Sequence, residues 1–322
     1  MKKYNLSIVI PVYNEEGSIK KLYEQINHSV LLLSEKEPDF NYEIIFVNDG
    51  STDGTYKLIN QIIRADNNVK LISFYQNKGK SEALNCAFKF SSGEIVITLD
   101  GDLQDDPIEF KNLINKLEEG ADMVTGWKKN RKDPLAKRIP SKIFNFVLRI
   151  LTNIKIHDFN CGLKAYKRYV IKNIDIYGGL HRFIPVLAKQ KGFTISEIIV
   201  NHRARKFGFS KYGTSRLFHG FYDLITILFL NKYFNRPLHL FGLLGFILFI
   251  SGFFINLNLT YKWFFHSEWI TPYKNPIFFL GILLIIVGMQ FFSTGLIGEL
   301  IVYFNKKRNY INEDIEFINY DK

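Results

Sequence analysis

Cysteine and proline are scarce in this 322-residue sequence, and both shortages limit the class of protein to which it can belong. The chain contains two cysteines, Cys86 and Cys161, and nine prolines. Two cysteines are too few for a disulfide framework, and both are compatible with a reducing cytosol. Hydrophobic residues make up 47% of the chain, which excludes an intrinsically disordered protein. The length allows one large domain or two modest ones.

Two common phosphate-binding motifs and a secretion signal are also missing. No G-x-G-x-x-G follows the first apolar segment, and no G-x-x-x-x-G-K-[ST] is present, so neither a dinucleotide fingerprint nor a P-loop is indicated. The apolar run in "MKKYNLSIVIPVYNEE" is too short for a signal peptide, and we interpret it as a buried strand.

The first 125 residues alternate β-rich segments with helix-like ones. The strand candidates are "LSIVIPV", "YEIIFVN", "VKLISFY", "EIVITLD" and "ADMVTG". This alternation predicts an α/β fold with a mostly parallel sheet and helices on both faces. Ligands of such sheets bind at the carboxyl ends of the strands, where this sequence places polar residues.

The last third of the sequence contains two long segments without charged residues. Residues 238–257 and 276–298 contain no Asp, Glu, Lys or Arg over 20 and 23 residues. About 20 apolar residues cross the hydrocarbon core of a bilayer. Two buried core helices are the alternative, but neither segment has the polar face that such a helix presents to water. The pattern therefore predicts a transmembrane hairpin.

Basic residues around these segments predict the orientation of the hairpin. Lys306, Lys307 and Arg308 follow the second segment, whereas the connecting loop contains only Lys262 and Lys274. Lys and Arg are enriched on the cytoplasmic side of membranes. We therefore expect both termini and the domain before the hairpin to be cytoplasmic, at a bacterial inner membrane.

These features predict an integral membrane protein with four parts. Residues 215–235 are too often interrupted by polar side chains to span a membrane and are interpreted as an interfacial helix. Residues 141–154 share this pattern, although an amphipathic core helix is a nearly equal alternative. The four parts are a cytoplasmic catalytic domain (1–214), a juxtamembrane helix (215–235), two transmembrane helices within 236–304 (near 238–258 and 276–298) and a cytoplasmic tail (305–322).

Positive charge is concentrated in two parts of the chain, whose net charge is +11. Residues 128–142 contain seven Lys or Arg and one acid, and residues 203–216 contain five Lys or Arg and no acid. Both clusters adjoin apolar segments, which favours a lipid bilayer over nucleic acid as the partner. The sequence has no recognisable nucleic-acid-binding module, so we expect no nucleic-acid partner.

Four aspartates lie in the segment "LDGDLQDDP", residues 99–107, directly after the fourth strand candidate. An EF-hand is excluded, because its Gly at position six and Glu at position twelve are Asp105 and Lys111 here. Asp106, together with Asp105, is interpreted as the cap of a helix that begins at Pro107.

Asp100 and Asp102 have no such capping role. They flank Gly101, which permits a tight turn, so both carboxylates can point toward one divalent cation. Mg²⁺ and Mn²⁺ are bound by one or two carboxylates while keeping positions for substrate phosphates, and Gln104 offers a further carbonyl oxygen. The spacing therefore predicts a metal that joins the protein to a diphosphate.

Four segments, in this order, resemble the nucleotide-sugar half of the family 2 glycosyltransferases, which have the GT-A fold: "SIVIPVYNEE", "VNDGSTDGT", "NKGKSEALNCAF" and "LDGDLQDDP". Later, "DFNCGLKAYKR", "HRFIPVLAKQKGF" and "FGFSKYG", followed by two apolar spans, resemble the polyisoprenyl-phosphate glycosyltransferases, the group that includes dolichol-phosphate mannose synthase. The resemblance covers nearly the whole chain. It implies a Rossmann-like GT-A catalytic domain followed by interfacial helices and a two-helix transmembrane hairpin.

The resemblance also implies a metal site and two catalytic residues. The D-x-D pair of the family corresponds to Asp100 and Asp102, with Gln104 as a third ligand of Mg²⁺ or Mn²⁺. Asp158, in "HDFNC", corresponds to a carboxylate near the acceptor. Asp102 and Asp158 are therefore the expected catalytic residues. Asp158 would remove a residual proton or orient the sugar, and the start of a turn is the alternative role.

On the donor side, the resemblance implies a wall around the nucleotide, an acid at the base and a basic loop near the diphosphate. Strand-end packing is an equal alternative for Pro11 and Tyr13, and solvated surface positions are the alternative for Lys78 and Lys80. The residues assigned to the nucleotide sugar are Pro11, Tyr13, Glu15, Asp49, Lys78, Lys80 and Asp100.

On the acceptor side, the sequence departs from the family pattern. Lys128 stands nearest the position where the family has an arginine, and lysine lacks the bidentate fork of a guanidinium. The family also has a basic residue four positions before a serine, and Lys137 has that spacing to Ser141, with Arg138 adjacent. A membrane-surface patch is a competing or additional interpretation of the later basic loop. The residues assigned to the acceptor phosphate are Lys128, Lys137, Arg138, Ser141, Arg205, Ser210 and Lys211.

The implied reaction is inverting, metal-dependent transfer of a sugar from a UDP-glucose-like or GDP-mannose-like nucleotide sugar to a polyisoprenyl phosphate. A phosphate monoester is already mostly anionic at pH 7, so a strong general base is less necessary than with a hydroxyl acceptor. A protein or glycan acceptor, or a non-catalytic nucleotide-sugar-binding membrane protein, are the alternatives. A homo-oligomer is compatible with the two spans.

Overall fold

The computed structural model consists of two compact units, Met1–Ile227 and Leu228–Lys322, and each is described by itself. The described residues are 6–35, 40–129, 135–203, 226, 229, 233, 236–265 and 274–309, with the backbone alone for 135–140 and 305–309.

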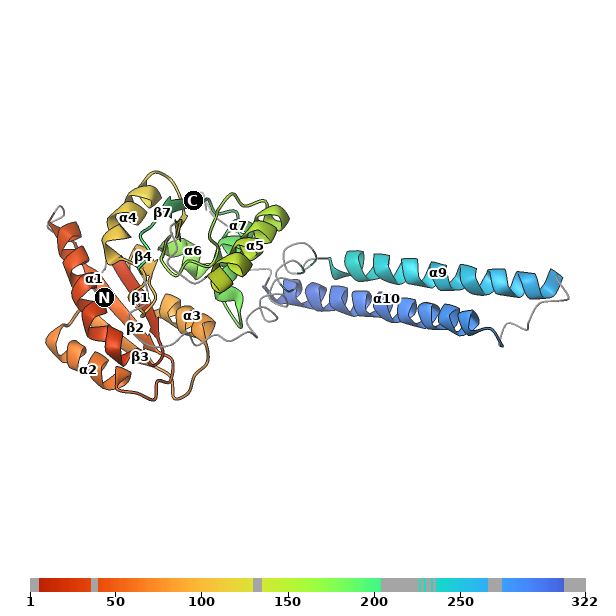
Figure 1. Ribbon diagram of the computed structural model, residues 1–322, viewed down its shortest axis with the longest axis horizontal. Helices are drawn as coiled ribbons and strands as arrows, with labels where there is room; N and C mark the ends of the chain where they lie inside the picture. The colour runs from red at the N-terminus through yellow and green to blue at the C-terminus, as the bar shows by residue number, and fades with distance from the viewer. Residues whose placement is uncertain are drawn as a thin grey trace, which may run out of the picture. The chain divides into compact units, whose positions relative to one another are not determined.

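The first unit is built on a seven-stranded sheet with the order β3-β2-β1-β4-β6-β5-β7. Figure 1 labels β1, β2, β3, β4 and β7 of this sheet. Neighbouring strands are parallel, except that β6 runs antiparallel to both β4 and β5. The predicted α/β fold with a mostly parallel sheet is confirmed. The strands are β1 (Leu6–Val12), β2 (Tyr42–Asn48), β3 (Val69–Ser73), β4 (Ile95–Thr98), β5 (Met123–Trp127), β6 (Lys164–Lys167) and β7 (Ile195–Ile199).

Apolar stripes on the helices explain how they cover this sheet. In α1, Ile19, Leu22, Ile26 and Val30 recur every three or four residues, and all four are buried. The helices are α1 (Glu16–Ser34), α2 (Thr55–Ala65), α3 (Lys80–Phe90), α4 (Phe110–Glu118), α5 (Leu135–Thr152), α6 (Arg168–Lys172) and α7 (Ile184–Gln190), with 3₁₀ turns η1 (Pro107–Glu109) and η2 (Leu180–Phe183).

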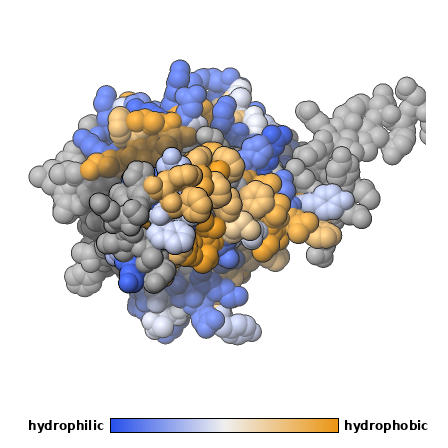
Figure 2. Space-filling model, turned by 90° about the vertical axis from the view of Figure 1, so that its right-hand side faces the viewer, coloured by the Kyte–Doolittle hydropathy of each residue, from blue (hydrophilic) through white to orange (hydrophobic). Residues whose placement is uncertain are grey.

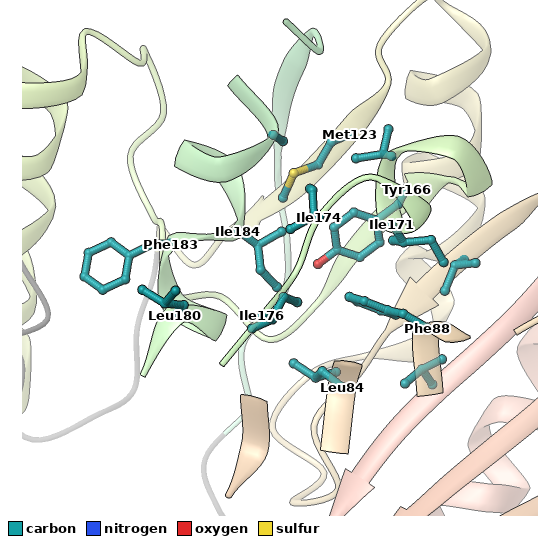
Figure 3. Close-up of a cluster of buried hydrophobic side chains, with 14 of the residues drawn as sticks. Leu84, Phe88, Met123, Tyr166, Ile171, Ile174, Ile176, Leu180, Phe183 and Ile184 are labelled. Atoms are coloured by element: carbon teal, nitrogen blue, oxygen red, sulfur yellow. The ribbon is translucent and has the colours of Figure 1, made fainter. Parts of the chain in front are cut away.

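Two hydrophobic clusters lie on the two faces of the sheet, because successive strand residues point to opposite faces. One cluster contains residues of α1, α2 and α4 together with Ile8 of β1. The other contains Val9 of β1 with residues of α3, α5, α6 and α7, and Figure 3 shows its centre. There the rings of Phe88 and Tyr166 pack edge to face with centroids 5.6 Å apart.

The strand order places a candidate site at one edge of the sheet. β1 lies between β2 and β4 and runs parallel to both, so the carboxyl ends of the three strands meet. In open α/β sheets, ligands bind at these ends, where neighbouring strands lead to opposite sides. The segments beyond Val12, Asn48 and Thr98 therefore converge on one region.

The second unit is a helical hairpin of α9 (Pro237–Phe265) and α10 (Pro276–Asn309). Both helices are long and apolar enough to cross a membrane. Glycines lie at their contact: a Cβ on Gly252 would lie 2.4 Å from the carbonyl oxygen of Gly281. Large apolar side chains such as Phe246, Phe254 and Ile286 face outward, and the hairpin viewed end-on in Figure 2 is largely hydrophobic.

The two apolar C-terminal helices are therefore confirmed. The predicted juxtamembrane helix, 215–235, lies outside the described residues apart from three positions, and so do residues 310–322. The division into four parts stays a prediction.

Candidate active site

Asp100 follows β4 and fits into a slot left by a glycine on the neighbouring chain segment. A Cβ on Gly162 would lie 2.5 Å from the carboxyl carbon of Asp100 and 2.5–2.6 Å from its oxygens. Real Cβ atoms do not approach other atoms this closely, so a side chain at position 162 would displace the carboxylate. Thr98 Oγ1 donates to Gly162 O at 2.9 Å and holds the two segments together.

Lys80 pairs directly with Asp100. Its Nζ lies 2.5 Å from Oδ1 of Asp100. Burial by itself would raise the pKa of the Asp100 carboxyl, but Lys80, aided by Lys128, lowers that pKa to about 2. Asp100 is therefore an anion at any physiological pH.

Asp102 points back into the acidic turn. It is buried, and its Oδ1 accepts the backbone N–H of Gln104 at 3.1 Å. The side-chain Nε2 of Gln104 donates to Arg203 O at 3.4 Å. Ser18 Oγ of α1 donates to Gly101 O at 2.6 Å and ties the turn to the first helix.

The oxygen donors of this turn fit a hard divalent cation such as Mg²⁺ or Mn²⁺. In the described part of the chain, no group of three or more His, Cys, Asp or Glu side chains is arranged to hold a metal. Two carboxylates, Asp100 and Asp102, are sufficient where a substrate diphosphate and water supply the other ligands. The slot at Gly162, which only a glycine leaves open, keeps one of these carboxylates in place.

Asp49, at the end of β2, organises the loop that carries the two predicted basic residues. Its Oδ1 accepts the N–H of Lys78 at 2.7 Å, and its Oδ2 accepts the N–H of Gly79 at 3.0 Å. The ammonium of Lys78 lies 5.2 Å from the centroid of the Phe74 ring. Both oxygens of Asp49 thus fix the loop before α3 and the position of Lys80 at the start of that helix.

The end of β1 contributes the remaining donor-side residues. Pro11 lines a small cavity together with Lys80 and Asp100. The cavity volume is about 10 Å³, close to what a single water needs. Tyr13 and Glu15 follow Pro11 in the sequence and are partly buried. The backbone oxygen of Glu15 accepts a hydrogen bond from Ser18 Oγ at 2.9 Å.

Lys128 has a different partner from the expected acceptor phosphate. It is 8% exposed at its side chain, and its Nζ lies 2.6 Å from Oδ1 of Asp105. Burial opposes the charge on Lys128, but Asp105 raises its pKa above the ordinary lysine value. Asp105 is therefore not a helix cap, and only Asp106 caps η1, by accepting the N–H of Ile108. The capping interpretation was wrong for Asp105 because its carboxylate pairs with Lys128, which is distant in the sequence.

Asp158 is also buried and starts a turn. Its Oδ1 accepts the N–H of Asn160 at 3.1 Å, and Thr125 Oγ1 donates to its backbone carbonyl at 3.4 Å. This is the alternative role considered from the sequence. The turn leads into Cys161 and Gly162, so Asp158 supports the segment that holds Asp100.

The other acceptor-side residues are described only in part. Ser141 lies half-buried on α5, and Lys137 and Arg138 belong to the same helix, with only their backbones described. Arg205, Ser210 and Lys211 lie outside the described residues. Their assignments to the acceptor phosphate stay predictions.

Three residues near Asp100 belong to the later sequence motifs, and no role is predicted for them from the sequence. Lys164 is buried and donates to Cys161 O, and Tyr166 lines the same cavity as Asp100. His181, which belongs to η2, also lines this cavity. The segments "GLKAYK" and "HRF" contain the signal, but only the tertiary fold brings these residues to Asp100.

His181 is held in one orientation by Ser81. The Ser81 hydroxyl accepts the backbone N–H of His181 at 3.1 Å and lies 2.9 Å from its Nδ1. These two contacts hold the imidazole ring in place beside α3. Burial, reinforced by Lys80, keeps the pKa of His181 well below its ordinary value, so the ring is neutral at pH 7.

Residues 7–175 match the family described as Glycosyl transferase family 2. The chain belongs to this family. It is 33% identical over 319 residues to dodecaprenyl-phosphate galacturonate synthase of Rhizobium johnstonii, covering 98% of this chain and 91% of that protein. It is 35% identical to undecaprenyl-phosphate 4-deoxy-4-formamido-L-arabinose transferase of Yersinia pestis, covering 92% and 88%. This family 2 protein is therefore a glycosyltransferase, and these relatives are polyprenyl-phosphate sugar transferases.

Solved structures show the same fold as this family 2 enzyme. Glucosyl-3-phosphoglycerate synthase of Mycobacterium tuberculosis, in complex with phosphoglyceric acid, aligns with a TM-score of 0.54 at 20% identity, covering 71% of this chain and 80% of that chain. Its complex with Mn²⁺, UDP and glucosyl-3-phosphoglycerate aligns with a TM-score of 0.53 at 21% identity. The GT-A fold expected from the motifs is confirmed.

Proposed function

We propose that this glycosyltransferase moves a sugar from a nucleotide sugar to a polyprenyl phosphate at the cytoplasmic face of a membrane, with Mg²⁺ or Mn²⁺. The observation that carries the proposal is the 33% identity to a dodecaprenyl-phosphate sugar synthase over 98% of the chain, hairpin included. The acidic turn at the sheet edge supports the same proposal, because it offers the carboxylates that a metal-bound diphosphate requires.

On the donor side, Asp100 and Asp102 would hold the metal, and the metal would stabilise the charge that develops on the departing nucleoside diphosphate. The related M. tuberculosis fold was solved with both Mn²⁺ and UDP, which favours a divalent ion and a UDP-sugar. His181 lines the same cavity as Asp100, so its neutral imidazole would lie beside the bound diphosphate or sugar.

On the acceptor side, α5 has the surface of a membrane-facing helix. Ile143, Phe146 and Ile150 recur every three or four residues and are all exposed. Lys142 and Arg149 lie on the same helix. An amphipathic basic helix of this kind lies in the headgroup region, where the phosphate of a polyprenyl lipid is confined. The two apolar helices would anchor the enzyme to that bilayer.

The chemistry needs little proton transfer. The second pKa of a phosphate monoester is about 6, so the acceptor oxygen is mostly anionic at pH 7 and attacks the anomeric carbon directly. Direct attack inverts the configuration at that carbon. The described contacts of Asp158 favour a positioning role over a general-base role, since its carboxylate holds a turn.

The test is transfer of radiolabelled sugar into lipid. Purified full-length enzyme in detergent, with undecaprenyl phosphate and Mn²⁺, is incubated with labelled UDP-glucose, UDP-galacturonate or GDP-mannose. The label is expected in the organic phase for at least one donor. Label that enters protein or soluble glycan instead would support the alternative acceptors, and no transfer under any condition would contradict the proposal.

Asp102→Asn should lower transfer by about 10³-fold or more, because a lost metal ligand removes stabilisation of the leaving group. Asp106→Asn is the matched control, since asparagine also caps η1, and we expect it to retain activity within a few-fold. Equal rates for wild type and Asp102→Asn would refute the metal assignment.

A further inference from the structure

The Lys80–Asp100 pair brings an ammonium group to a carboxylate that the proposed function gives to the metal. Nζ and Oδ1 are 2.5 Å apart. Mg²⁺ binds carboxylate oxygen at about 2.1 Å, so a metal on this oxygen would lie next to the ammonium. Two cations this close repel strongly in a partly buried site. Lys80 and a metal ion therefore compete for Asp100.

Asp100 has less freedom than Lys80 to resolve this conflict by moving. Its short side chain packs over Gly162, where a Cβ would lie 2.5–2.6 Å from the carboxylate atoms. Lys128 and Lys164 act on Asp100 electrostatically, but both are buried and contact Asp105 and Cys161 O. The two side chains are similarly exposed, 27% for Lys80 and 31% for Asp100, but Lys80 has the longer and more flexible stem. Lys80 is thus the member of the pair that moves more easily.

We propose that Lys80 is a positioning residue that occupies Asp100 when no donor is bound and transfers its ammonium to the donor diphosphate when the metal–nucleotide complex enters. This inference rests on the metal dependence in the proposed function. Lys80 then acts as an internal counter-ion that prevents the empty site from taking up a metal alone.

Charge balance explains why the site would accept a metal–nucleotide complex but not a metal ion alone. A lone divalent cation would add two positive charges beside Lys80, Lys128 and Lys164. A metal already bound to a nucleoside diphosphate carries compensating phosphate charge and offers Lys80 new anionic partners. The exchange leaves no charge unpaired, because the Lys80 ammonium moves from Asp100 to the diphosphate while the metal takes its place at Asp100. The loop that Asp49 holds keeps Lys80 within reach of both.

The test measures Mn²⁺ binding to the full-length protein in the absence of nucleotide, using the electron paramagnetic resonance signal of free Mn²⁺. Lys80→Met should bind Mn²⁺ about tenfold more tightly than wild type, because the competing cation is gone. Lys80→Arg keeps the charge and should bind Mn²⁺ as weakly as wild type. Lys89→Met, which removes an exposed charge in the last turn of α3, should leave this affinity unchanged.

The same Lys80→Met variant should raise the KM for the donor in the transfer assay, since the diphosphate loses a partner. Opposite changes in metal affinity and donor KM are not expected from a residue with a purely structural role. Lys80→Gln replaces Lys80→Met if the latter does not fold, as judged by its melting temperature.

Unchanged Mn²⁺ affinity in both neutral variants would overturn the inference, and so would equal tightening by Lys89→Met. These binding measurements need neither sugar nor lipid. They would therefore fail or succeed independently of the proposed acceptor and transfer reaction, which the lipid-extraction assay tests.

Discussion

Glycine creates space in both units of this protein, but different groups fill that space. In the α/β unit, Gly162 makes room for the carboxylate of Asp100. In the hairpin, Gly245 and Gly288 make room for each other's backbone: a Cβ on either would lie 2.6–2.7 Å from the carbonyl oxygen of the other. Gly162 positions a candidate metal ligand, whereas Gly245 and Gly288 allow two helices to approach closely.

The large apolar side chains differ in the same way. In the α/β unit they fill the two clusters on either side of the sheet. In the hairpin, Phe246, Phe254 and Ile286 face outward, while Gly242, Gly245 and Gly252 are buried. Outward apolar side chains with small residues at the helix contact are typical of packing in lipid, where burial of apolar surface gives no advantage. The two units are therefore built for different solvents.

Among substitutions of the glycines that create space, the largest effect should come from adding a methyl group at the site. Gly162→Ala forces the Asp100 carboxylate out of its slot, and displacement of a catalytic group by about 1 Å costs on the order of 10²-fold in rate. We expect the transfer rate to fall by that factor with the fold intact. Initial rates in the lipid-extraction assay and a melting curve measure the two quantities.

Gly126→Ala is the control for this substitution. Its Cβ would approach Val200 at 2.8 Å and the sulfur of Cys161 at 2.9 Å, a slightly milder steric conflict that does not involve Asp100. It should lose stability to a similar extent but retain more activity than Gly162→Ala. Similar activity in the two variants would show that the slot over Gly162 does not position Asp100.

The sequence is informative about this site where the signal is local. The apolar runs predict β1 to β5, and the D-x-D spacing after β4 singles out Asp100 and Asp102. Contacts between distant segments are not accessible in this way. Asp105 pairs with Lys128, which directly follows β5, so its carboxylate does not have the helix-capping role that the local pattern suggests.

The antiparallel strand β6 is the part of the sheet that local sequence patterns do not predict. It has only four residues, Lys164–Lys167, two of them lysine, so it shows no apolar run. Its pairing with both β4 and β5 buries Ala165 and Tyr166 and brings Gly162 against Asp100. Pairing with β4 and β5 stabilises this strand, whereas its own sequence gives little indication of it.

In the hairpin, bulk at the helix contact should destabilise the unit more than bulk on its outer surface. Gly288→Leu would bring side-chain atoms against Gly245 O and Phe249 N, both 2.7 Å from the position of a Cβ. Overpacking of this kind costs roughly 1–3 kcal/mol. We expect a melting temperature several degrees lower in detergent. Ser293→Leu, at an exposed position of α10, adds more bulk outside and should change the melting temperature little.

The smallest effect concerns a buried carboxylate that serves stability in the α/β unit. Glu43 of β2 is fully buried and accepts hydrogen bonds from Ser7, Ser92 and Lys70, with Lys70 Nζ at 2.6 Å. Burial alone would raise the pKa of Glu43, but these partners lower it overall. In the hairpin, Glu299 accepts only a 3.5 Å bond from Leu238 N among the contacts described.

A folded-state pKa below the unfolded value means that the charge of Glu43 stabilises the fold above the ordinary glutamate pKa, near 4.3. That contribution is lost as the pH falls toward the lowered pKa. Glu43→Gln should therefore cost about 1–2 kcal/mol at pH 7 and progressively less below pH 4, in thermal melts across this range. Glu118→Gln, at an exposed position of α4, should show no such pH-dependent difference. If the cost of Glu43→Gln stayed constant with pH, Glu43 would be uncharged in the fold, and Lys70 would contact a neutral acid.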